Sequence, residues 1–447
     1  MSSALVVGLG RSGTAAAALL IRRGWHVIAV DAHPVTAPEL SALGVDVRGG
    51  YVDPVPDVAL VVKSPGVPGD AAQIVAARAA GVAVISEIEL AARELSNPII
   101  AVTGTNGKTT TTELAAHLLR SAGRPALACG NQGLPLASLV DTVDPGTWLV
   151  VECSSFQLED SDRFHPRAAV VLNLTPDHLD RHHTMDEYRA AKVRIFEAMT
   201  PGDLAIAPEG WEIPGRAQPR VIRDGARRDA GDIAWSEGGL HVAGLGMVAG
   251  WDAIPLRGRH NRENIMAAAA LVAHAAQLTR AELAAGLASF AGVGHRLEVV
   301  AEIEGVKYVN DSKATNTDAA CAALDAYPHG VHLIAGGKPK GASFAPLADA
   351  ARAAGVRCVY LIGNAAAEIG QAMRAAGVPT RDAGTLTEAV AAASAAAEPG
   401  DVVLLAPGCA SFDQFTSFEE RGDRFRALVA DLAAGRSTAP PGGGQTA

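Results

Sequence analysis

The chain has 447 residues, 49% of them hydrophobic and 19% charged, and a formal net charge of −10. This length exceeds what one hydrophobic core normally serves, so two or three domains are expected. No apolar run approaches the roughly 18 residues of a membrane span, and the acidic balance argues against general nucleic-acid binding, so we expect neither membrane insertion nor a nucleic-acid partner. Five scattered cysteines without a C-x-x-C pair predict neither a zinc ribbon nor a disulfide framework.

Short apolar runs alternate with alanine-rich stretches along the whole chain, which predicts an α/β fold with parallel sheets covered on both faces. The first predicted domain is Rossmann-like and covers residues 1–93. Its strands are expected at residues 5–7, 27–30, 59–62 and 82–85. The first run is too short for the core of a signal peptide, so we expect a cytoplasmic chain.

A glycine motif follows the first of these strands. Gly8-Leu-Gly-Arg-Ser-Gly13, with Asp31 after the second strand, matches a dinucleotide-binding fingerprint. The motif alone does not establish NAD, because a helix N-terminus accepts the diphosphate of any nucleotide-linked ligand.

The second domain is predicted over residues 94–294 and is centred on a P-loop. Its strands are expected at residues 98–103, 148–151 and 168–172, with a β-containing excursion at 201–258. Thr103-Gly-Thr-Asn-Gly-Lys-Thr-Thr110 follows the first strand and precedes a predicted helix at 113–120. Its backbone N–H groups would cradle phosphates, Lys108 would neutralise them and Thr109 would hold Mg²⁺. Val102 replaces the first glycine of the general P-loop pattern, so the loop is shorter. A plain glycine-rich turn is the alternative, but it would not need the lysine and threonines.

Two further strand ends carry polar side chains. Glu152 ends a buried strand, where a P-loop enzyme places a metal-binding acid. Asp177, His178 and Asp180 follow the next strand in one loop, which is either a metal site or a solvated loop. The shared sheet edge favours the site.

The third predicted domain, residues 295–435, is again Rossmann-like. Its strands are expected at residues 307–310, 332–335, 358–362 and 402–406. Asp311 and Lys313 follow the first strand, and Gly336-Gly-Lys-Pro-Lys-Gly341 ends the second. Two basic strand-end loops in an acidic protein suggest an anionic ligand, although a solvated surface is the alternative. The proline- and glycine-rich tail 436–447 is predicted to be disordered.

Eight segments in uninterrupted order over residues 4–433 resemble the Mur ligases of peptidoglycan synthesis. They are GTNGKTT, ECSSFQLE, LTPDHLDRH, YRAAK, GRHNRENIMAA, GHRLE, NDSKATN and GCASFDQFTSFEERGDRF. Among Mur ligases, SSFQLE and CASFDQF are typical of the members that add D-glutamate, and the D-N-P-R segment of the diaminopimelate- or lysine-adding members is absent.

The resemblance implies an activity. It implies a monomeric, cytoplasmic ligase that uses ATP to join D-glutamate to UDP-N-acetylmuramoyl-L-alanine through an acyl phosphate, in cell-wall biogenesis. The three domains would bind the UDP moiety, then ATP and metal, then D-glutamate.

The resemblance also implies site residues. The ATP contacts would be Gly104, Thr105, Asn106, Gly107, Lys108, Thr109, Thr110, Asn264, Arg296, Asp311 and Lys313. Two Mg²⁺ ions would be held by Thr109 and Glu152 and by His178 and Lys192, the lysine as its carbamate. Substrate contacts would be Gly10, Arg11, Ser12, Asp31, Ser64, Asn131, Ser154, Lys340, Ser411 and Phe418. The catalytic residues would be Lys108, Glu152, His178, Lys192 and Lys313. His33 stands where many members carry arginine, which leaves that uracil or diphosphate contact open.

Two other function classes remain as alternatives. An NAD-dependent oxidoreductase with a regulatory P-loop module would use Gly8–Gly13 and Asp31. A non-catalytic ATP-binding switch would use the P-loop alone.

Overall fold

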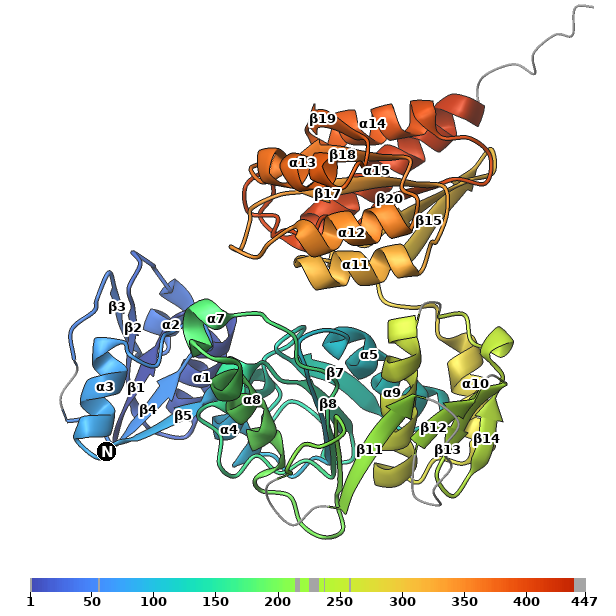
Figure 1. Ribbon diagram of the computed structural model, residues 1–447. Helices are drawn as coiled ribbons and strands as arrows, with labels where there is room; N and C mark the ends of the chain where they lie inside the picture. Colours follow the sequence, from blue (N-terminus) through green and yellow to red (C-terminus); the bar gives the residue numbers. More distant parts are fainter. Residues whose placement is uncertain are drawn as a thin grey trace, which may run out of the picture. The chain divides into compact units, whose positions relative to one another are not determined.

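The structure is a computed structural model that describes residues 2–54, 57–213, 218–224, 233–236, 238–256 and 259–437. The chain divides into two compact units, residues 1–255 with 261–290 and residues 256–260 with 291–447. Within the described ranges, two β-sheets lie in the first unit and one in the second (Figure 1).

The N-terminal sheet is parallel, with the strand order β3-β2-β1-β4-β5. Its elements are β1 (Ser3–Val7), α1 (Arg11–Arg22), β2 (His26–Asp31), α2 (Pro38–Ala42), β3 (Asp46–Gly49), β4 (Leu60–Lys63), α3 (Ala72–Ala79), β5 (Ala83–Ser86) and α4 (Glu87–Ala92). Along β1, Val6 packs into one apolar core, whereas Leu5 and Val7 pack into another on the opposite face. Both faces of the sheet are therefore covered, as the Rossmann-like prediction requires.

The second sheet has the order β14-β13-β12-β11-β10-β9-β6-β8-β7. Its strands are β6 (Ile99–Thr103), β7 (Ala126–Gly130), β8 (Trp148–Glu152), β9 (Ala168–Val171), β10 (Leu204–Ala207), β11 (Gln218–Asp224), β12 (Ile233–Ser236), β13 (Gly239–Val242) and β14 (Gly246–Ala249). Strands β6 to β12 pair in parallel, and β13 and β14 add an antiparallel edge, so the predicted β-containing excursion is confirmed.

Helices of the second sheet connect its strands and carry several candidate residues. They are α5 (Lys108–Ser121), α6 (Ser155–Leu158), α7 (Leu179–His182), α8 (Met185–Val193), α9 (Arg259–Ala275) and α10 (Arg280–Ser289), with short 3₁₀ turns η1 (Leu136–Ser138), η2 (Arg194–Phe196) and η3 (Trp251–Ala253). Helix α5 begins at Lys108, five residues before the predicted start at 113, because the P-loop leads directly into its first turn.

The third sheet has the order β15-β16-β20-β17-β18-β19. Its elements are β15 (Glu298–Ile303), β16 (Val306–Asn310), α11 (Thr317–Asp325), β17 (Val331–Gly336), α12 (Ala345–Ala353), β18 (Cys358–Ile362), α13 (Ala366–Ala375), β19 (Thr380–Gly384), α14 (Leu386–Ala396), β20 (Val402–Leu405) and α15 (Phe418–Ser437).

Two details of this unit differ from prediction. Strand β15 pairs antiparallel with β16, so the sheet is mixed; Glu304 and Gly305, both at positive φ, form the tight hairpin turn. Helix α15 reaches Ser437, so the first two residues of the predicted disordered tail are helical, and 438–447 lie outside the described residues.

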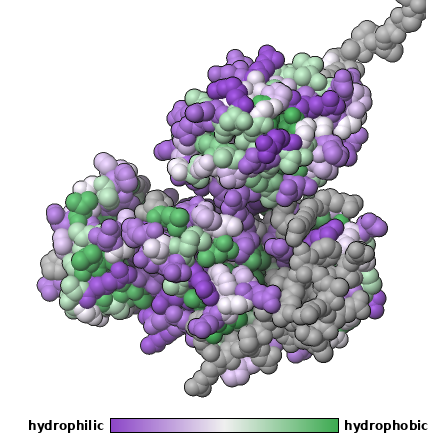
Figure 2. Space-filling view, viewed as in Figure 1, coloured by the Kyte–Doolittle hydropathy of each residue, from purple (hydrophilic) through white to green (hydrophobic). Residues whose placement is uncertain are grey.

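The surface is mixed in character. Where Figure 2 colours it, hydrophilic residues are interspersed with hydrophobic ones. No helix within the described ranges combines the length and apolarity that crossing a bilayer requires.

Candidate active site

The P-loop joins the end of β6 to the start of α5. Gly107 has φ 82°, and a Cβ there would collide with the side-chain oxygen of Asn264 on α9, so the turn requires glycine. The backbone N–H of Asn106 donates to Asn173 Oδ1 at 2.9 Å, which fixes the loop against the segment after β9. The first turn of α5 contains no acidic residue and no side chain caps it. A helix start of this kind, with glycine before it and no acidic side chain in its first turn, is suited to an anion.

Lys108 folds back over this loop. Its Nζ donates to the carbonyl oxygens of Gly104 and Thr105 at 3.0 and 2.8 Å. The ammonium group is thus held next to the glycine-rich turn. This is the position in which a P-loop lysine neutralises phosphate charge.

Glu152 lies beside the P-loop helix because β6 and β8 are neighbours and end at the same sheet edge. Thr109 Oγ1 donates to Glu152 Oε2 at 2.7 Å, and Asn131 Nδ2 donates to Oε1 at 2.9 Å. Glu152 is 2% exposed. A threonine hydroxyl and a carboxylate side by side are hard oxygen ligands of the kind that Mg²⁺ prefers.

Lys192 on α8 is buried, contrary to the ordinary expectation for a lysine on a helix. It is 1% exposed, its Nζ donates to Gly104 O at 2.8 Å, and it lies 4.4 Å from the centre of the Tyr188 ring. Burial lowers the pKa of Lys192 well below its ordinary value, and the nearby Lys108 lowers it further. The amine is therefore biased toward its neutral form.

His178 reaches the same region through aromatic contacts. It has φ 55°, and its ring lies 5.0 Å from Phe156 and 6.5 Å from Tyr188, centre to centre. The Tyr188 hydroxyl lies 3.3 Å from Thr105 Oγ1. His178 and the P-loop therefore line one region, although the described residues contain no group of three or more His, Cys, Asp or Glu side chains that could hold a metal ion by themselves. The side chain of Asp180, the third polar residue predicted in this loop, lies outside the described part of the structure.

The glycine motif of the N-terminal sheet is held by Asp31 and Ser64. Leu9 N donates to Asp31 Oδ2 at 2.7 Å, and Ser64 Oγ donates to Gly8 O at 2.7 Å. Burial raises the pKa of Asp31, but hydrogen bonds from Leu9 and His33 outweigh it and the pKa lies below its ordinary value. The backbone N–H of His33 donates to Asp31 Oδ1 at 2.9 Å.

The glycine motif also approaches the loop after β7. The Arg11 guanidinium donates to Gly133 O, two residues beyond Asn131, whereas Gly10 and Arg11 are otherwise exposed and Ser12 is half-buried. Ser154 caps α6 in a reciprocal pair with Gln157, so it has a structural role. The first unit thus brings the predicted nucleotide-sugar contacts of the glycine motif close to the loop that begins at Asn131.

In the second unit, the predicted residues follow parallel strands β16, β17 and β20. Lys338 N donates to Ala410 O at 2.8 Å, which joins the loops that carry Lys340 and Ser411. Ser312 Oγ donates to the backbone oxygen of Phe418 at 2.8 Å, and Lys313 Nζ lies 5.1 Å from the centre of the Phe418 ring. Burial raises the pKa of Asp311 to about 6, although Arg296 opposes that shift.

The sequence reasoning missed two residues that shape the site. Asn173 Oδ1 accepts the backbone N–H of Asn106, and Asn173 Nδ2 donates to the Asn106 carbonyl oxygen. Tyr188 contacts both Thr105 and Lys192. Tyr188 could have been found, because it lies four residues before Lys192 and therefore on the same helix face.

Three family models match the chain. They are the N-terminal domain of MurD-like Mur ligases at residues 2–86, the Mur ligase middle domain at 102–272 and the Mur ligase glutamate ligase domain at 295–409. All three are ligase domains, so the oxidoreductase alternative finds no support.

Solved structures confirm the fold. The UDP-N-acetylmuramate-alanine ligase from Thermotoga maritima has a TM-score of 0.58 at 18% identity, over 97% of this chain and all of that chain. A pseudomurein peptide ligase type C from Methanothermus fervidus has a TM-score of 0.59 at 17% identity, over 96% of this chain and all of that chain.

Curated relatives are much closer in sequence. A protein from Pelotomaculum thermopropionicum named UDP-N-acetylmuramoylalanine–D-glutamate ligase is 43% identical over 96% of this chain and 98% of its own length. One of the same name from Acidobacterium capsulatum is 44% identical over 95% of both. The chain therefore belongs to the Mur ligase family, has that family's three-domain α/β fold, and groups with its members named UDP-N-acetylmuramoylalanine–D-glutamate ligase.

Proposed function

We propose that this chain joins D-glutamate to UDP-N-acetylmuramoyl-L-alanine with ATP, in the assembly of the peptidoglycan precursor. The alanyl carboxylate takes the γ-phosphoryl group of ATP and ADP leaves; the amine of D-glutamate then displaces phosphate from the acyl phosphate and an amide forms. The observation that carries the proposal is the contact of Thr109 with Glu152 beside a P-loop lysine, in a chain of this family.

Each predicted domain would bind a different ligand through the loops that follow its strands. We assign residues 1–93 to the UDP moiety, through Gly10, Arg11, Ser12, Asp31 and Ser64. Residues 94–294 would bind ATP and metal, and 295–435 would bind D-glutamate. Asn131 and Ser154 would complete the nucleotide-sugar contacts. Both substrates and ATP are water-soluble metabolites of the cell interior, and we propose a cytoplasmic monomer.

ATP would be held mainly by backbone N–H groups of residues 104–110, with Lys108 turned from the Gly104 and Thr105 carbonyls toward the phosphates. Asn264 fits this role because it already packs on Gly107 and accepts from Thr111 Oγ1 at 3.3 Å. We assign further nucleotide contacts to Arg296, Asp311 and Lys313 of the second unit.

The residues present fit Mg²⁺. Thr109 and Glu152 would hold one ion, and His178 with Lys192 would hold a second. A bound ion would offset the negative charge that builds up between carboxylate and phosphate. A protonated lysine cannot ligate a metal, so Lys192 would act as its carbamate; its burial and the neighbouring Lys108 favour the neutral amine that reacts with CO₂.

D-glutamate carries two carboxylates and an ammonium group, which must lose a proton before the amine can attack. Lys340 is exposed at the loop after β17 and Ser411 is buried after β20. A lysine ammonium and a hydroxyl can together orient the two carboxylates, and the backbone at Phe418 would complete the subsite.

A phosphate-release assay tests the proposal. With ATP, Mg²⁺ and UDP-N-acetylmuramoyl-L-alanine, D-glutamate should stimulate release, whereas L-glutamate, L-lysine, meso-diaminopimelate and D-alanine should not. Stimulation by another amino acid would move the assignment to another member of the family. ADP formation that needs neither acceptor nor amino acid would support the switch alternative instead.

A further inference from the structure

The turn that carries Arg296 is strained. His295 and Leu297, on either side of it, have φ values of 60° and 44°. Such angles are uncommon for residues other than glycine, and they are strained for a leucine. A strained turn persists only where surrounding contacts hold it.

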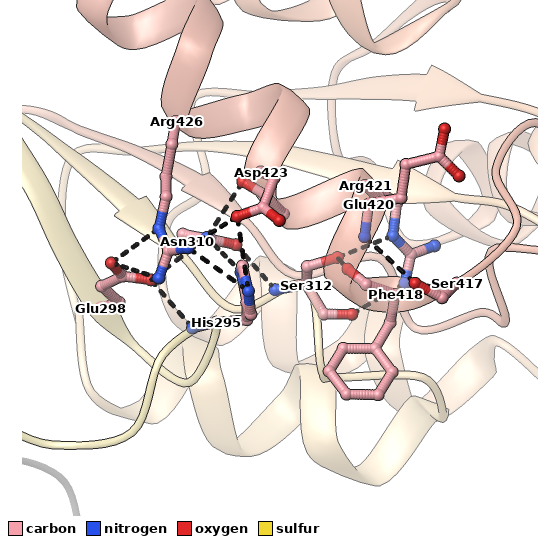
Figure 3. Close-up of polar contacts among 11 residues, drawn as sticks. His295, Glu298, Asn310, Ser312, Ser417, Phe418, Glu420, Arg421, Asp423 and Arg426 are labelled. Atoms are coloured by element: carbon pink, nitrogen blue, oxygen red, sulfur yellow. Dashed lines mark hydrogen bonds and ion pairs between the residues drawn. The ribbon is translucent and has the colours of Figure 1, made fainter. Parts of the chain in front are cut away.

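Glu298 and Arg426 supply those contacts. Arg426 Nε donates to Glu298 Oε1 and Arg426 Nη2 to Glu298 Oε2, both at 2.9 Å, so the pair is bidentate (Figure 3). Glu298 Oε2 in turn accepts the backbone N–H of His295 at 2.8 Å and the Asn310 amide at 3.3 Å. The carboxylate therefore ties α15 and β16 to the first residue of the strained turn.

The same turn is joined to the Asp311–Lys313 loop. Lys313 N donates to His295 O at 3.1 Å, and Leu297 N donates to Asp311 Oδ1 at 3.4 Å. Helix α15 approaches so closely that a Cβ on Gly422 would collide with the His295 ring. Residues 295–298, 310–313 and 422–426 thus form one network, and Figure 3 labels six of its members: His295, Glu298, Asn310, Ser312, Asp423 and Arg426.

Arg296 is the residue in this turn whose hydrogen bonding is incomplete. Its Nε is buried, and within the described residues it has no hydrogen-bond partner. A buried N–H without an acceptor is destabilising, because it has lost its hydrogen bond to water and gained none in the protein. This unpaired donor lies at the centre of a strained turn. The combination indicates a ligand that supplies the missing acceptor.

We propose that Glu298 and Arg426 are positioning residues for Arg296: their ion pair holds the left-handed His295–Leu297 turn and so places the guanidinium for the nucleotide. This inference rests on the assignment of Arg296 to the nucleotide under the proposed function. A purely structural role, in which the pair only fastens α15 to β15, is the competing explanation.

The test uses the full chain with Glu298→Gln, Arg426→Ala, the double variant, and Arg426→Lys as the conservative replacement. Arg424→Ala is the matched control, because Arg424 lies on the same helix, is exposed and donates to Thr387 Oγ1 at 3.4 Å, away from Glu298. Calorimetry measures the Kd of Mg-ADP and of a non-hydrolysable ATP analogue, and thermal melting measures stability.

Glu298→Gln and Arg426→Ala should each weaken nucleotide binding about tenfold. The double variant should be no weaker than the single ones, because each single variant already breaks the Glu298–Arg426 ion pair. Arg426→Lys should recover part of the affinity, and Arg424→Ala should match the unmodified chain. In steady state, KM for ATP should rise while KM for D-glutamate stays unchanged.

Folded variants that bind nucleotide within twofold of the unmodified chain would overturn the proposal. So would unfolding of both single variants, since the pair would then be structural. Binding is measured without acceptor or amino acid. A chain that binds nucleotide but does not use D-glutamate would therefore refute the proposed function and leave this comparison intact.

Discussion

Thr109 Oγ1 donates to Glu152 Oε2 at 2.7 Å, across the edge where β6 and β8 end side by side. The two residues are 43 positions apart in the chain. Their contact follows from the parallel pairing of β6 with β8, which aligns Val102 with Glu152. Under the proposed function, this hydroxyl and this carboxylate would share one Mg²⁺ ion with the phosphates of ATP.

Glu152→Gln should lower turnover on the order of 100-fold, because an amide lacks the charge that holds the cation. The Mg²⁺ concentration that gives half-maximal activity should also rise. Phosphate release over a Mg²⁺ titration measures both. Glu197→Gln, which removes an exposed carboxylate of the same unit, should change neither the turnover nor the Mg²⁺ requirement. An unchanged Mg²⁺ requirement in Glu152→Gln would contradict the metal assignment.

Lys108→Ala should abolish turnover, with a loss on the order of 1000-fold. Lys108→Arg should not restore it, because the planar guanidinium cannot replace a compact ammonium between the carbonyls of Gly104 and Thr105. Single-turnover ADP formation is the measurement. Near-normal ADP release by Lys108→Ala would refute the phosphate role of this lysine.

Lys192→Ala should be inactive but folded, and formate or acetate should restore part of its activity by replacing the carbamate. In the unmodified chain, ¹³C-bicarbonate should give a carbamate signal by NMR that Lys192→Ala lacks. The reason is the burial of Lys192 beside Lys108, which favours a neutral amine. Full activity of Lys192→Ala without added carboxylate would exclude the carbamate.

The sequence predicted ranges for most buried parallel strands of this fold but gave none for several strands at the sheet edges. The edge strands without a predicted range include β3, β7, β15 and β19, whereas β10 to β14 lie in the stretch that was predicted only as β-containing. An edge strand has a neighbour on one side only, so its sequence need not be a continuous apolar run. Asp46–Gly49 and Thr380–Gly384 show this directly, since half or more of their residues are polar or glycine.

The candidate site was predictable where it depends on strand ends and not where it depends on tertiary packing. Thr103–Thr110 and Glu152 each follow from one strand and its loop. The burial of Lys192 requires α8 to lie against the P-loop, and Lys192 is 88 residues from the carbonyl of Gly104 that it contacts. Spacing along the helix cannot reveal that contact.

Glu87 gives a prediction about pH and stability. It is 1% exposed, Oε1 accepts the N–H of Ala137 at 2.5 Å, and Oε2 has no hydrogen-bond partner in the described part of the chain. Burial raises the pKa of Glu87 to about 7, against the opposing N–H groups of Ala137 and Leu136. The folded chain therefore keeps a proton on Glu87 that the unfolded chain releases above about pH 4.5.

The direction of the change in stability with pH follows from this proton. Because the folded state binds more protons between pH 4.5 and 7, the contribution of Glu87 to the free energy of unfolding falls over this range, by about 3 kcal/mol in total, and is constant above it. Glu87→Gln cannot titrate, so its stability relative to the unmodified chain should rise by about that amount from pH 4.5 to pH 8. All five tryptophans lie within residues 1–255, so tryptophan fluorescence in urea reports the unit that contains Glu87. Glu197→Gln controls for the loss of a carboxylate. If the difference in the free energy of unfolding between Glu87→Gln and the unmodified chain does not change with pH, Glu87 keeps its ordinary ionisation.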